Sequence, residues 1–169
     1  MNSSQLINQT SGKVEYYTPS EIVEAVRRVL GFIDLDPFSS AAANDLIGAQ
    51  HYFTANEDGL KQDWFGRFFM NHPFGREMNP RCVKKAESEF AIGHTVQGCA
   101  ITFACTSEAW FKPLLLRPQC FLTPRTNYLL PDGSTLRGVT KGSVVTYYGR
   151  NVQKFVREFS ALGVVKVLA

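Results

Sequence analysis

The chain alternates between short apolar runs, typical of buried strands, and amphipathic stripes with a helical period. We expect strands at residues 32–36, 50–53, 67–71, 99–105, 120–123, 142–148 and 164–168, and helices at residues 18–30, 41–46, 81–92, 108–116 and 152–159. This order favours a single-domain α/β fold with a mostly parallel sheet. A Pro-Asp-Gly turn at residues 131–133 predicts a hairpin and an antiparallel C-terminal edge.

The start of the first helix carries several signals for a helix N-terminus. Thr18 is a candidate cap, Pro19 suits the first helical position, and Glu21 completes a capping box with Thr18. Gly31 comes after the last apolar position and is expected to end the helix. Residues 1–14 are polar and are expected to form a flexible arm before a domain over residues 15–169.

Composition excludes several classes of protein. The hydrophobic fraction is 44% and the charged fraction is 20%, which is typical of a globular domain. No apolar run approaches the roughly 18 residues that span a membrane, and the N-terminus does not read as a signal peptide. The four cysteines form no CxxC pair and the chain has three histidines. We therefore expect a cytoplasmic protein with no membrane, metal or disulfide.

The segment Met-Asn-His-Pro-Phe-Gly at residues 70–75 comes directly after an apolar run and is the first candidate site. Asn71 offers a side-chain oxygen that accepts hydrogen bonds. Pro73 biases His72 towards extended geometry, which turns a backbone carbonyl outward. Phe74 offers a flat face on which a nucleobase can stack. The combination suits holding an amino group in a cleft, and the alternative is an ordinary turn after a strand.

The second candidate site is Asp34-Leu35-Asp36-Pro37-Phe38-Ser39-Ser40. In open α/β sheets, ligands bind beyond the carboxyl ends of the strands. Asp34 and Asp36 can accept hydrogen bonds from an ammonium group or from ribose hydroxyls, and Phe38 can pack on an apolar part of the ligand. The alternative is a strand that ends in a proline turn, with Asp36 capping the next residues of the chain.

Two further segments are weaker candidates. Residues 16–19, Tyr-Tyr-Thr-Pro, precede a helix whose N-terminus suits a carboxylate, although the tyrosines could simply pack. Asp58 and Asp63 lie in a polar segment between two expected strands and could line an adenine or ribose pocket. Trp64, in the same segment, reads more readily as a buried core residue.

Cations cluster in two places, and the net charge of +3 permits contact with a polyanion without requiring it. The first group lies just after the Asn71 segment and comprises Arg76, Arg81, Lys84 and Lys85. The second group comprises Arg117, Arg125, Arg137, Lys141 and Arg150. The alternative for both groups is an ordinary solvated surface.

Taken in order, the segments resemble a known family over about residues 15–165. The matching segments are Tyr17-Thr18-Pro19, Ile33-Asp34-Leu35-Asp36-Pro37, Ala43-Asn44, Tyr52-Phe53-Thr54, Asp58-Gly59-Leu60, Gln62-Asp63-Trp64, Met70-Asn71-x-Pro73-Phe74 and Gly142-Ser143-Val144-Val145-x-Tyr147-x-Gly149. Their order resembles the phage-type DNA N6-adenine methyltransferases.

The resemblance implies a Rossmann-like fold that uses S-adenosylmethionine to methylate the N6 amine of adenine in double-stranded DNA. It implies catalytic roles for Asn71, His72, Pro73 and Phe74. It implies cofactor contacts for Tyr17, Thr18, Pro19, Asp34, Asp36, Pro37, Phe38, Ser39, Asp58 and Asp63. DNA contacts are expected from Arg76, Arg81, Lys84, Lys85 and Arg125. A chain this short has little room for a separate target-recognition domain, so we expect low sequence specificity. The resemblance also suggests a phage or bacterial host enzyme that protects DNA from restriction.

Position 72 departs from the family pattern because His72 stands where the family has proline. The backbone carbonyl is retained, whereas the fixed φ angle of proline is lost. Phe74 in place of tyrosine is a milder change, since stacking needs only the ring. Two alternatives therefore stay open: a weakened or inactive relative that still binds DNA or cofactor, and a methyltransferase acting on RNA or on a protein glutamine.

Overall fold

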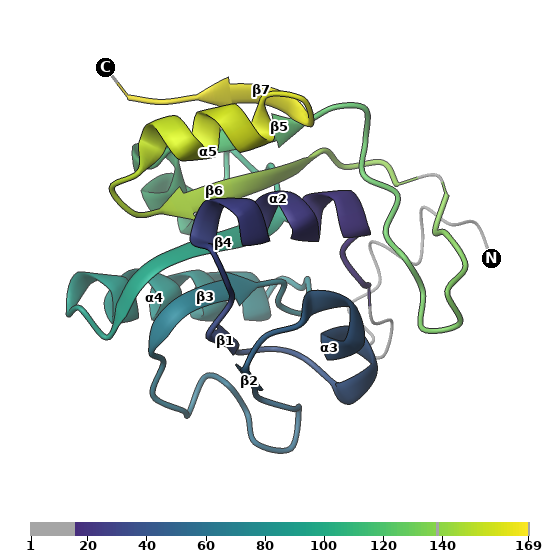
Figure 1. Cartoon of the computed structure of the whole chain (residues 1–169), viewed down its shortest axis with the longest axis vertical. Coiled ribbons are helices and arrows are strands. Elements are labelled where there is room, and N and C mark those ends of the chain that lie inside the picture. Colours follow the sequence, from purple (N-terminus) through teal and green to yellow (C-terminus); the bar gives the residue numbers. More distant parts are fainter. Residues whose placement is uncertain (1–15, 138, 169) are drawn as a thin grey trace.

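The computed structural model describes residues 16–137 and 139–168, so the arm expected at residues 1–14 lies outside the described residues. The described chain forms one seven-stranded sheet with the order β2-β1-β3-β4-β6-β5-β7 (Figure 1). The strands are β1 (Leu35–Asp36), β2 (His51–Tyr52), β3 (Gly66–Met70), β4 (Thr95–Phe103), β5 (Gln119–Leu122), β6 (Ser143–Tyr148) and β7 (Gly163–Lys166).

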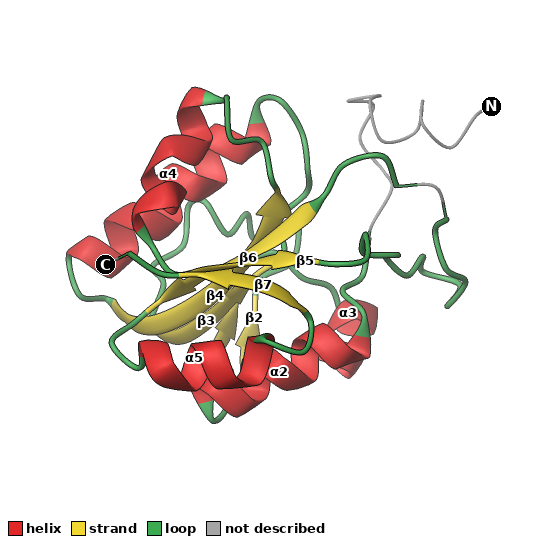
Figure 2. Ribbon diagram, turned by 90° about the horizontal axis from the view of Figure 1, so that it is seen from above, coloured by secondary structure: helices red, strands yellow, loops and turns green. Residues whose placement is uncertain are grey.

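Helices cover both faces of this sheet (Figure 2). They are α2 (Ser20–Leu30), α3 (Ala41–Ile47), α4 (Met78–Ala91), the 3₁₀-helix η1 (Ala109–Leu116) and α5 (Val152–Phe159). Helices α2, α3 and α5 lie on one face, and α4 lies on the other with η1 packed against it. These helices match the sequence predictions closely, except that residues 109–116 form a 3₁₀-helix.

The pairing direction changes halfway across the sheet. Strands β2, β1, β3 and β4 pair in parallel, whereas β4–β6, β6–β5 and β5–β7 pair antiparallel. The mixed α/β class and the antiparallel C-terminal part are as predicted. The antiparallel part accounts for half of the pairings, so it is larger than a single edge. The turn at residues 131–133 forms outside this sheet, with the Leu130 N–H donating to the Ser134 carbonyl at 2.8 Å.

Successive side chains of strand β3 point to opposite faces of the sheet and so contribute to two hydrophobic cores, one on each face. Phe68 and Met70 point into the layer under α4 and η1, and Phe69 points into the layer under α2 and α5. All three side chains are fully buried. A strand buried on both faces reads as a continuous apolar run, which is why this segment was recognisable in the sequence.

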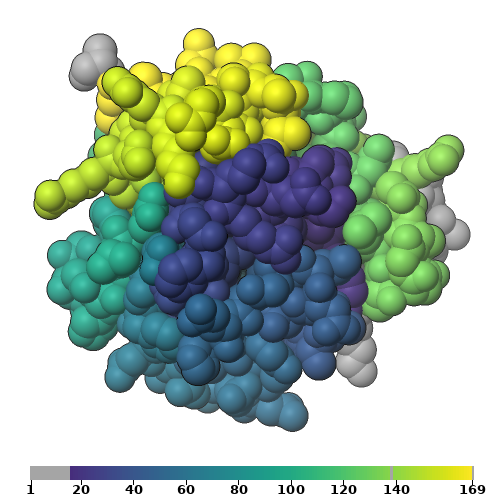
Figure 3. Space-filling view, viewed as in Figure 1, coloured from purple at the N-terminus to yellow at the C-terminus, as the bar shows by residue number. Residues whose placement is uncertain are grey.

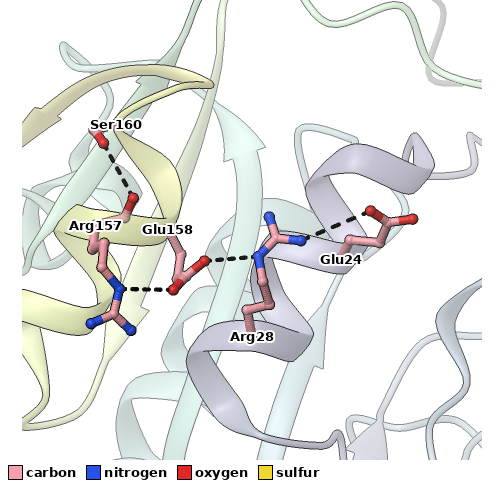
Figure 4. Close-up of polar contacts among 5 residues, drawn as sticks. All are labelled: Glu24, Arg28, Arg157, Glu158 and Ser160. Atoms are coloured by element: carbon pink, nitrogen blue, oxygen red, sulfur yellow. Dashed lines mark hydrogen bonds and ion pairs between the residues drawn. The ribbon is translucent and has the colours of Figure 1, made fainter.

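Ion pairs join α2 to α5 on the outside of their layer. Arg28 of α2 donates from Nε to Glu158 of α5 at 2.7 Å, and Arg157 contacts the other carboxylate oxygen of Glu158 at 3.0 Å (Figure 4). Arg28 also lies 3.9 Å from Glu24. Glu158 is partly buried, whereas Glu24 and both arginines are largely exposed, so the contribution of these pairs to stability is small beside the packing beneath them.

The N-terminus of α2 differs from the prediction. Pro19 is the N-cap residue, no side chain caps the helix, and the Thr18–Glu21 capping box is absent. The Pro19 carbonyl instead accepts from the N–H groups of Ile22 and Val23. The Thr18 hydroxyl is directed instead to Asn71, which is distant in the sequence. Gly31 ends the helix with φ of 86°, as expected for a glycine stop signal.

Candidate functional site

A cavity of about 440 Å³ lies beyond the carboxyl ends of β1 and β3. These strands are neighbours, with Leu35 paired to Phe68, so the residues after them meet at one edge of the sheet. The lining comprises Tyr16, Tyr17, Thr18, Asp36, Phe38, Ser39, Ser40, Ala43, Ile47, Thr54, Ala55, Asp58, Gly59, Asn71, His72, Pro73, Phe74 and Met78. The candidate segments at residues 16–19, 34–40 and 70–75 therefore all contribute to one cavity. Asp58, from the fourth candidate segment, lines the same cavity.

The Asn71 carboxamide has a defined orientation. Its Nδ2 group donates to the Tyr16 carbonyl at 2.8 Å and to the Thr18 hydroxyl at 3.1 Å. A carbonyl oxygen only accepts, so the NH₂ end of the carboxamide must face Tyr16. The Oδ1 atom is consequently left as the acceptor at the other end of the amide, and Asn71 lines the cavity.

Replacing Thr18 with alanine tests this anchor. One of the two acceptors for Nδ2 would disappear, and the carboxamide would be held less firmly. If the activity of this site depends on Asn71, we expect a loss of about 3- to 10-fold in kcat, the size of one ordinary hydrogen bond. Thr18→Ser keeps the hydroxyl and should stay within about twofold of the native rate. Steady-state assays of both variants would make the comparison, and equal losses in the two would argue against the hydrogen bond.

His72 lies deep in the lining rather than at an exposed mouth, with 2% of its surface accessible. Its Nε2 atom lies 2.9 Å from Asn79 Oδ1, which also accepts from the Gly75 N–H at 3.3 Å. Since a carboxamide oxygen only accepts, Nε2 carries the proton. Burial lowers the pKa of His72 to about 4, so the imidazole is neutral at physiological pH. This hydrogen bond ties the segment to the start of α4.

Phe74 is half-buried and keeps part of its surface in the cavity. Its ring centroid lies 4.4 Å from that of Phe103 and 5.8 Å from that of Tyr128, and His72 meets it edge-on at 5.4 Å. Neighbouring rings therefore hold Phe74 without sealing it in the core. Pro73 is exposed beside it and also lines the cavity.

Asp36, the last residue of β1, is a buried carboxyl group in the cavity lining, 2% exposed. Oδ1 accepts from the Phe38 N–H at 3.1 Å. Burial raises the pKa of Asp36 to about 7, against the opposing effect of hydrogen bonds from Phe38 and Ser39. Near neutral pH the group is therefore present in both protonation states, and a positively charged ligand would favour the carboxylate.

The loop containing Asp58 and Gly59 packs directly onto the Asp36 segment. A Cβ at position 59 would overlap the Pro37 carbonyl oxygen, so only glycine permits this close approach. Asp58 has φ of 55° and its carboxylate accepts from the Leu60 N–H at 3.2 Å. Trp64 is buried, as the sequence suggested, and its indole N–H donates to the Gly59 carbonyl at 2.8 Å.

Four of the predicted cofactor residues do not line the cavity: Pro19, Asp34, Pro37 and Asp63. Asp34 instead accepts from the backbone and guanidinium of Arg67, at 2.7 and 3.0 Å. Asp34 and Asp36 lie two positions apart but are separated by the buried Leu35, and only Asp36 reaches the cavity. Asp63 is exposed, and Pro19 and Pro37 are buried.

The cations divide into paired and exposed groups. Arg76, Arg81 and Lys84 are exposed, whereas Lys85 pairs with the buried carboxylate of Glu89. In the second group, Arg117 forms a bidentate pair with Glu87, at 2.9 and 2.6 Å. Arg150 lines a separate cavity of about 710 Å³ between β4, β6 and the start of α5. Arg125, Arg137 and Lys141 are exposed between β5 and β6.

Several lining residues had no signal in the sequence. They include Ile47, Ala55 and Met78. Asn79 was missed as well, although it holds His72. Residues of this kind occur in every globular domain, and only their placement around the cavity distinguishes them. The available signal was His72 itself. A histidine in place of proline could have suggested that another side chain, which proves to be Asn79, forms a hydrogen bond with it.

The described residues offer neither a metal cluster nor a membrane-spanning helix. No group of three or more metal-binding side chains occurs among them. None of the helices within residues 16–137 and 139–168 has the length and apolar character needed to cross a bilayer.

Comparison with known proteins identifies the family. The family of DNA N-6-adenine-methyltransferases (Dam) matches residues 7–124, more than half of the chain. The chain therefore belongs to this family, which confirms the resemblance seen in the sequence and supports a role as a DNA adenine methyltransferase. A search of curated proteins found no match to this chain.

Proposed function

We propose that this protein transfers the methyl group of S-adenosylmethionine to the N6 amine of adenine in duplex DNA, on a Rossmann-like domain. The observation that carries the proposal is the shared cavity of Asn71 and Asp36. The first is oriented as a hydrogen-bond acceptor, and the second is a buried carboxyl group at the carboxyl end of the first strand.

The lining has the chemistry that S-adenosylmethionine needs. The cavity volume of about 440 Å³ lies within the range of small-molecule sites. Asp36 and Asp58 supply carboxylates for a cationic group and for ribose hydroxyls, and Phe38 supplies an aromatic surface. Tyr17, Thr18 and Ser39 complete the set that we assign to the cofactor. When bound, the cofactor supplies an electrophilic methyl group on a sulfonium centre.

The residues from Asn71 to Phe74 would hold the target base. An adenine in a duplex is inaccessible, so it must leave the stack and enter the site, where Phe74 would stack on it. The amine lone pair is delocalised into the ring, which makes N6 a poor nucleophile. Asn71 Oδ1 and the His72 carbonyl would each accept one N–H hydrogen bond and so direct the lone pair towards the methyl group.

The reaction is a single displacement with a simple balance. A bond would form between N6 and the methyl carbon as the bond from that carbon to sulfur broke. The bonding electrons would leave with the thioether, and the alkylated amine would lose one proton to water. Positioning supplies most of the rate enhancement, because alignment of the two reactants makes the displacement effectively intramolecular.

DNA would approach over exposed cations near the cavity. Helix α4 begins at Met78, which lines the cavity, and Arg76, Arg81 and Lys84 are exposed just before it and on its first two turns. These side chains, together with Arg125, can contact phosphates without reading bases, which is consistent with low sequence specificity. Lys85 is not included, because it is committed to Glu89.

The direct test is transfer of labelled methyl from S-adenosylmethionine to varied duplexes, with nucleoside analysis of the product. We expect N6-methyl-2′-deoxyadenosine as the product in adenine-containing DNA and none in poly(dG)·poly(dC). Strict dependence on one long site would contradict low specificity. Preferential labelling of an RNA duplex or of protein would contradict the DNA assignment.

A second candidate function is a binding protein with weak turnover, and His72 favours it because an imidazole lines the cavity where the family has proline. The two candidates differ in how they respond to His72→Pro. A native enzyme should gain little, whereas a weakened relative should gain activity. Normal turnover in the native protein would rule out the second candidate.

A further inference from the structure

The connection between β5 and β6 is much longer than the sheet requires. The two strands are antiparallel neighbours, with Phe121 paired to Val144. Such strands are ordinarily joined by loops of roughly 2–5 residues, whereas here residues 123–142 lie between them. Long ordered loops without regular secondary structure are commonly functional. We call residues 123–142 the β5–β6 segment.

The described part of the β5–β6 segment is packed against the site. Tyr128 is 1% exposed, and its hydroxyl lies 2.8 Å from that of Ser143. Its ring contacts Tyr16 and Phe74, with centroid distances of 6.0 and 5.8 Å. Leu136 is also buried. The segment therefore rests on two residues of the cavity lining.

Two backbone hydrogen bonds join the β5–β6 segment to Tyr17, which lines the cavity. The Tyr17 N–H donates to the Leu129 carbonyl at 2.8 Å, and the Leu129 N–H donates to the Tyr17 carbonyl at 2.9 Å. Because Tyr17 lines the cavity, exposed side chains on the segment are held at a set position relative to the site. Figure 3 shows the segment, in green, projecting from the body of the molecule beside the purple start of the described chain.

The exposed charge on the β5–β6 segment is positive. Arg125, Arg137 and Lys141 are exposed, and none of them takes part in an ion pair among the described residues. Asp132 is the one acidic residue of the segment. Its carboxylate accepts from the backbone N–H and hydroxyl of Ser134, at 2.9 and 2.6 Å, within its own turn. Arg125 donates from Nη1 to the Val139 carbonyl at 3.4 Å, and the Lys141 ammonium lies 5.8 Å from the centroid of the Phe103 ring. Neither contact neutralises a charge, so the three cations can still contact an external anion.

We propose that the β5–β6 segment is an arm that binds the DNA backbone through Arg125, Arg137 and Lys141, beside the extruded base. This inference rests on the proposed function, which already assigns Arg125 to phosphate, and it adds Arg137, Lys141 and the attachment of the whole segment beside the cavity. Residues 125–142 lie beyond residue 124, where the family match ends. The attachment at Tyr17 and Tyr128 explains how phosphate contacts on the arm would set the position of the duplex relative to Asn71 and Phe74.

The test compares two triple variants of the full chain. Arg125→Gln/Arg137→Gln/Lys141→Gln removes three charges from the arm. Lys112→Gln/Lys154→Gln/Lys166→Gln removes three charges from η1, α5 and β7, and none of these lysines lines a cavity described above. Binding of a labelled adenine-containing duplex would be measured by fluorescence anisotropy at several salt concentrations, with S-adenosylmethionine affinity and unfolding curves measured in parallel.

For the arm variant we expect weaker DNA binding and a salt slope reduced by up to about 2.7, since each phosphate contact contributes about 0.9. The DNA KM should rise while kcat at saturating DNA changes little, and cofactor affinity should be unchanged. The lysine control should match the native protein. If the two variants bound DNA equally well and both had native unfolding curves, the proposal that the β5–β6 segment binds the DNA backbone would be wrong.

The two proposals can fail separately. If the native protein transfers no methyl group but the arm variant alone loses DNA binding, the arm stands and the proposed function fails. If the native protein methylates DNA and the arm variant shows native DNA affinity and KM, the proposed function stands and the arm fails.

Discussion

Replacing Asn71 with alanine is expected to lower kcat for adenine methylation about 100- to 1000-fold, the size of effect seen when a preorganised polar group at a reacting centre is lost. Both N–H groups of the carboxamide are anchored, on Tyr16 and Thr18, so its oxygen is held in place before the base arrives. In the Asn71→Ala variant, the His72 carbonyl would be the remaining hydrogen-bond acceptor for the adenine amine. Cofactor affinity should change little, because we assign Asn71 to the base.

The control is Asn151→Ala, which also removes one carboxamide. Asn151 accepts from the Lys154 N–H at 3.2 Å as the N-cap of α5, and it lies outside the Asn71 cavity. Loss of a cap costs about 1 kcal/mol of stability, so this variant should lose stability but not kcat. Single-turnover assays and unfolding curves on both variants would separate the two effects. An Asn71→Ala enzyme with native kcat would remove Asn71 from the mechanism.

The second large effect concerns how stability depends on pH, because Asp36 and His72 act in opposite directions. The pKa of Asp36 is raised by burial from 3.8 to about 7. Its folded form therefore binds a proton more tightly, and the stability that this supplies is lost as pH rises from about 4 to about 7. The pKa of His72 is lowered by burial from 6.5 to about 4. Its contribution is present above pH 6.5 and is lost as pH falls to about 4.

Between about pH 4 and pH 6.5 the two effects nearly cancel, since one group gains a proton on folding and the other loses one. Each shift corresponds to roughly 3 to 4 kcal/mol over its full range. Asp36→Asn should expose the His72 effect, so that the variant loses stability relative to the native protein as pH falls. His72→Gln should expose the Asp36 effect and show the reverse trend.

Urea unfolding of the native protein and of both variants, at several pH values between 4 and 7.5, would measure these trends. Differences from the native protein remove the contribution of all other titrating groups. Curves for both variants that run parallel to the native curve would show that neither group has a shifted pKa. Divergence in the same direction would show that one of the two assignments is wrong.

Local sequence patterns were sufficient to place most elements, for identifiable reasons. The run Phe68-Phe69-Met70 is continuously apolar, which is typical of a strand covered on both faces. Gly31 needs a positive φ, so it marked a helix end. The start of α2 misled the prediction because Thr18 carries a capping side chain whose hydroxyl is bonded to Asn71 instead.

For the candidate site, the order of residues was enough to indicate which chemical groups lie at the carboxyl ends of the strands: Asp36 at the end of the first and Asn71 at the end of the third. Strand period and motif spacing are local properties, so they could be read from the chain directly. It took the packed fold to establish that these groups share a cavity, that Asp34 turns to Arg67, and that His72 is held by Asn79. Those outcomes depend on strand order and on hydrogen bonds between residues distant in sequence, such as Thr18 and Asn71. No local pattern encodes them, because each depends on which segments the packed sheet brings together.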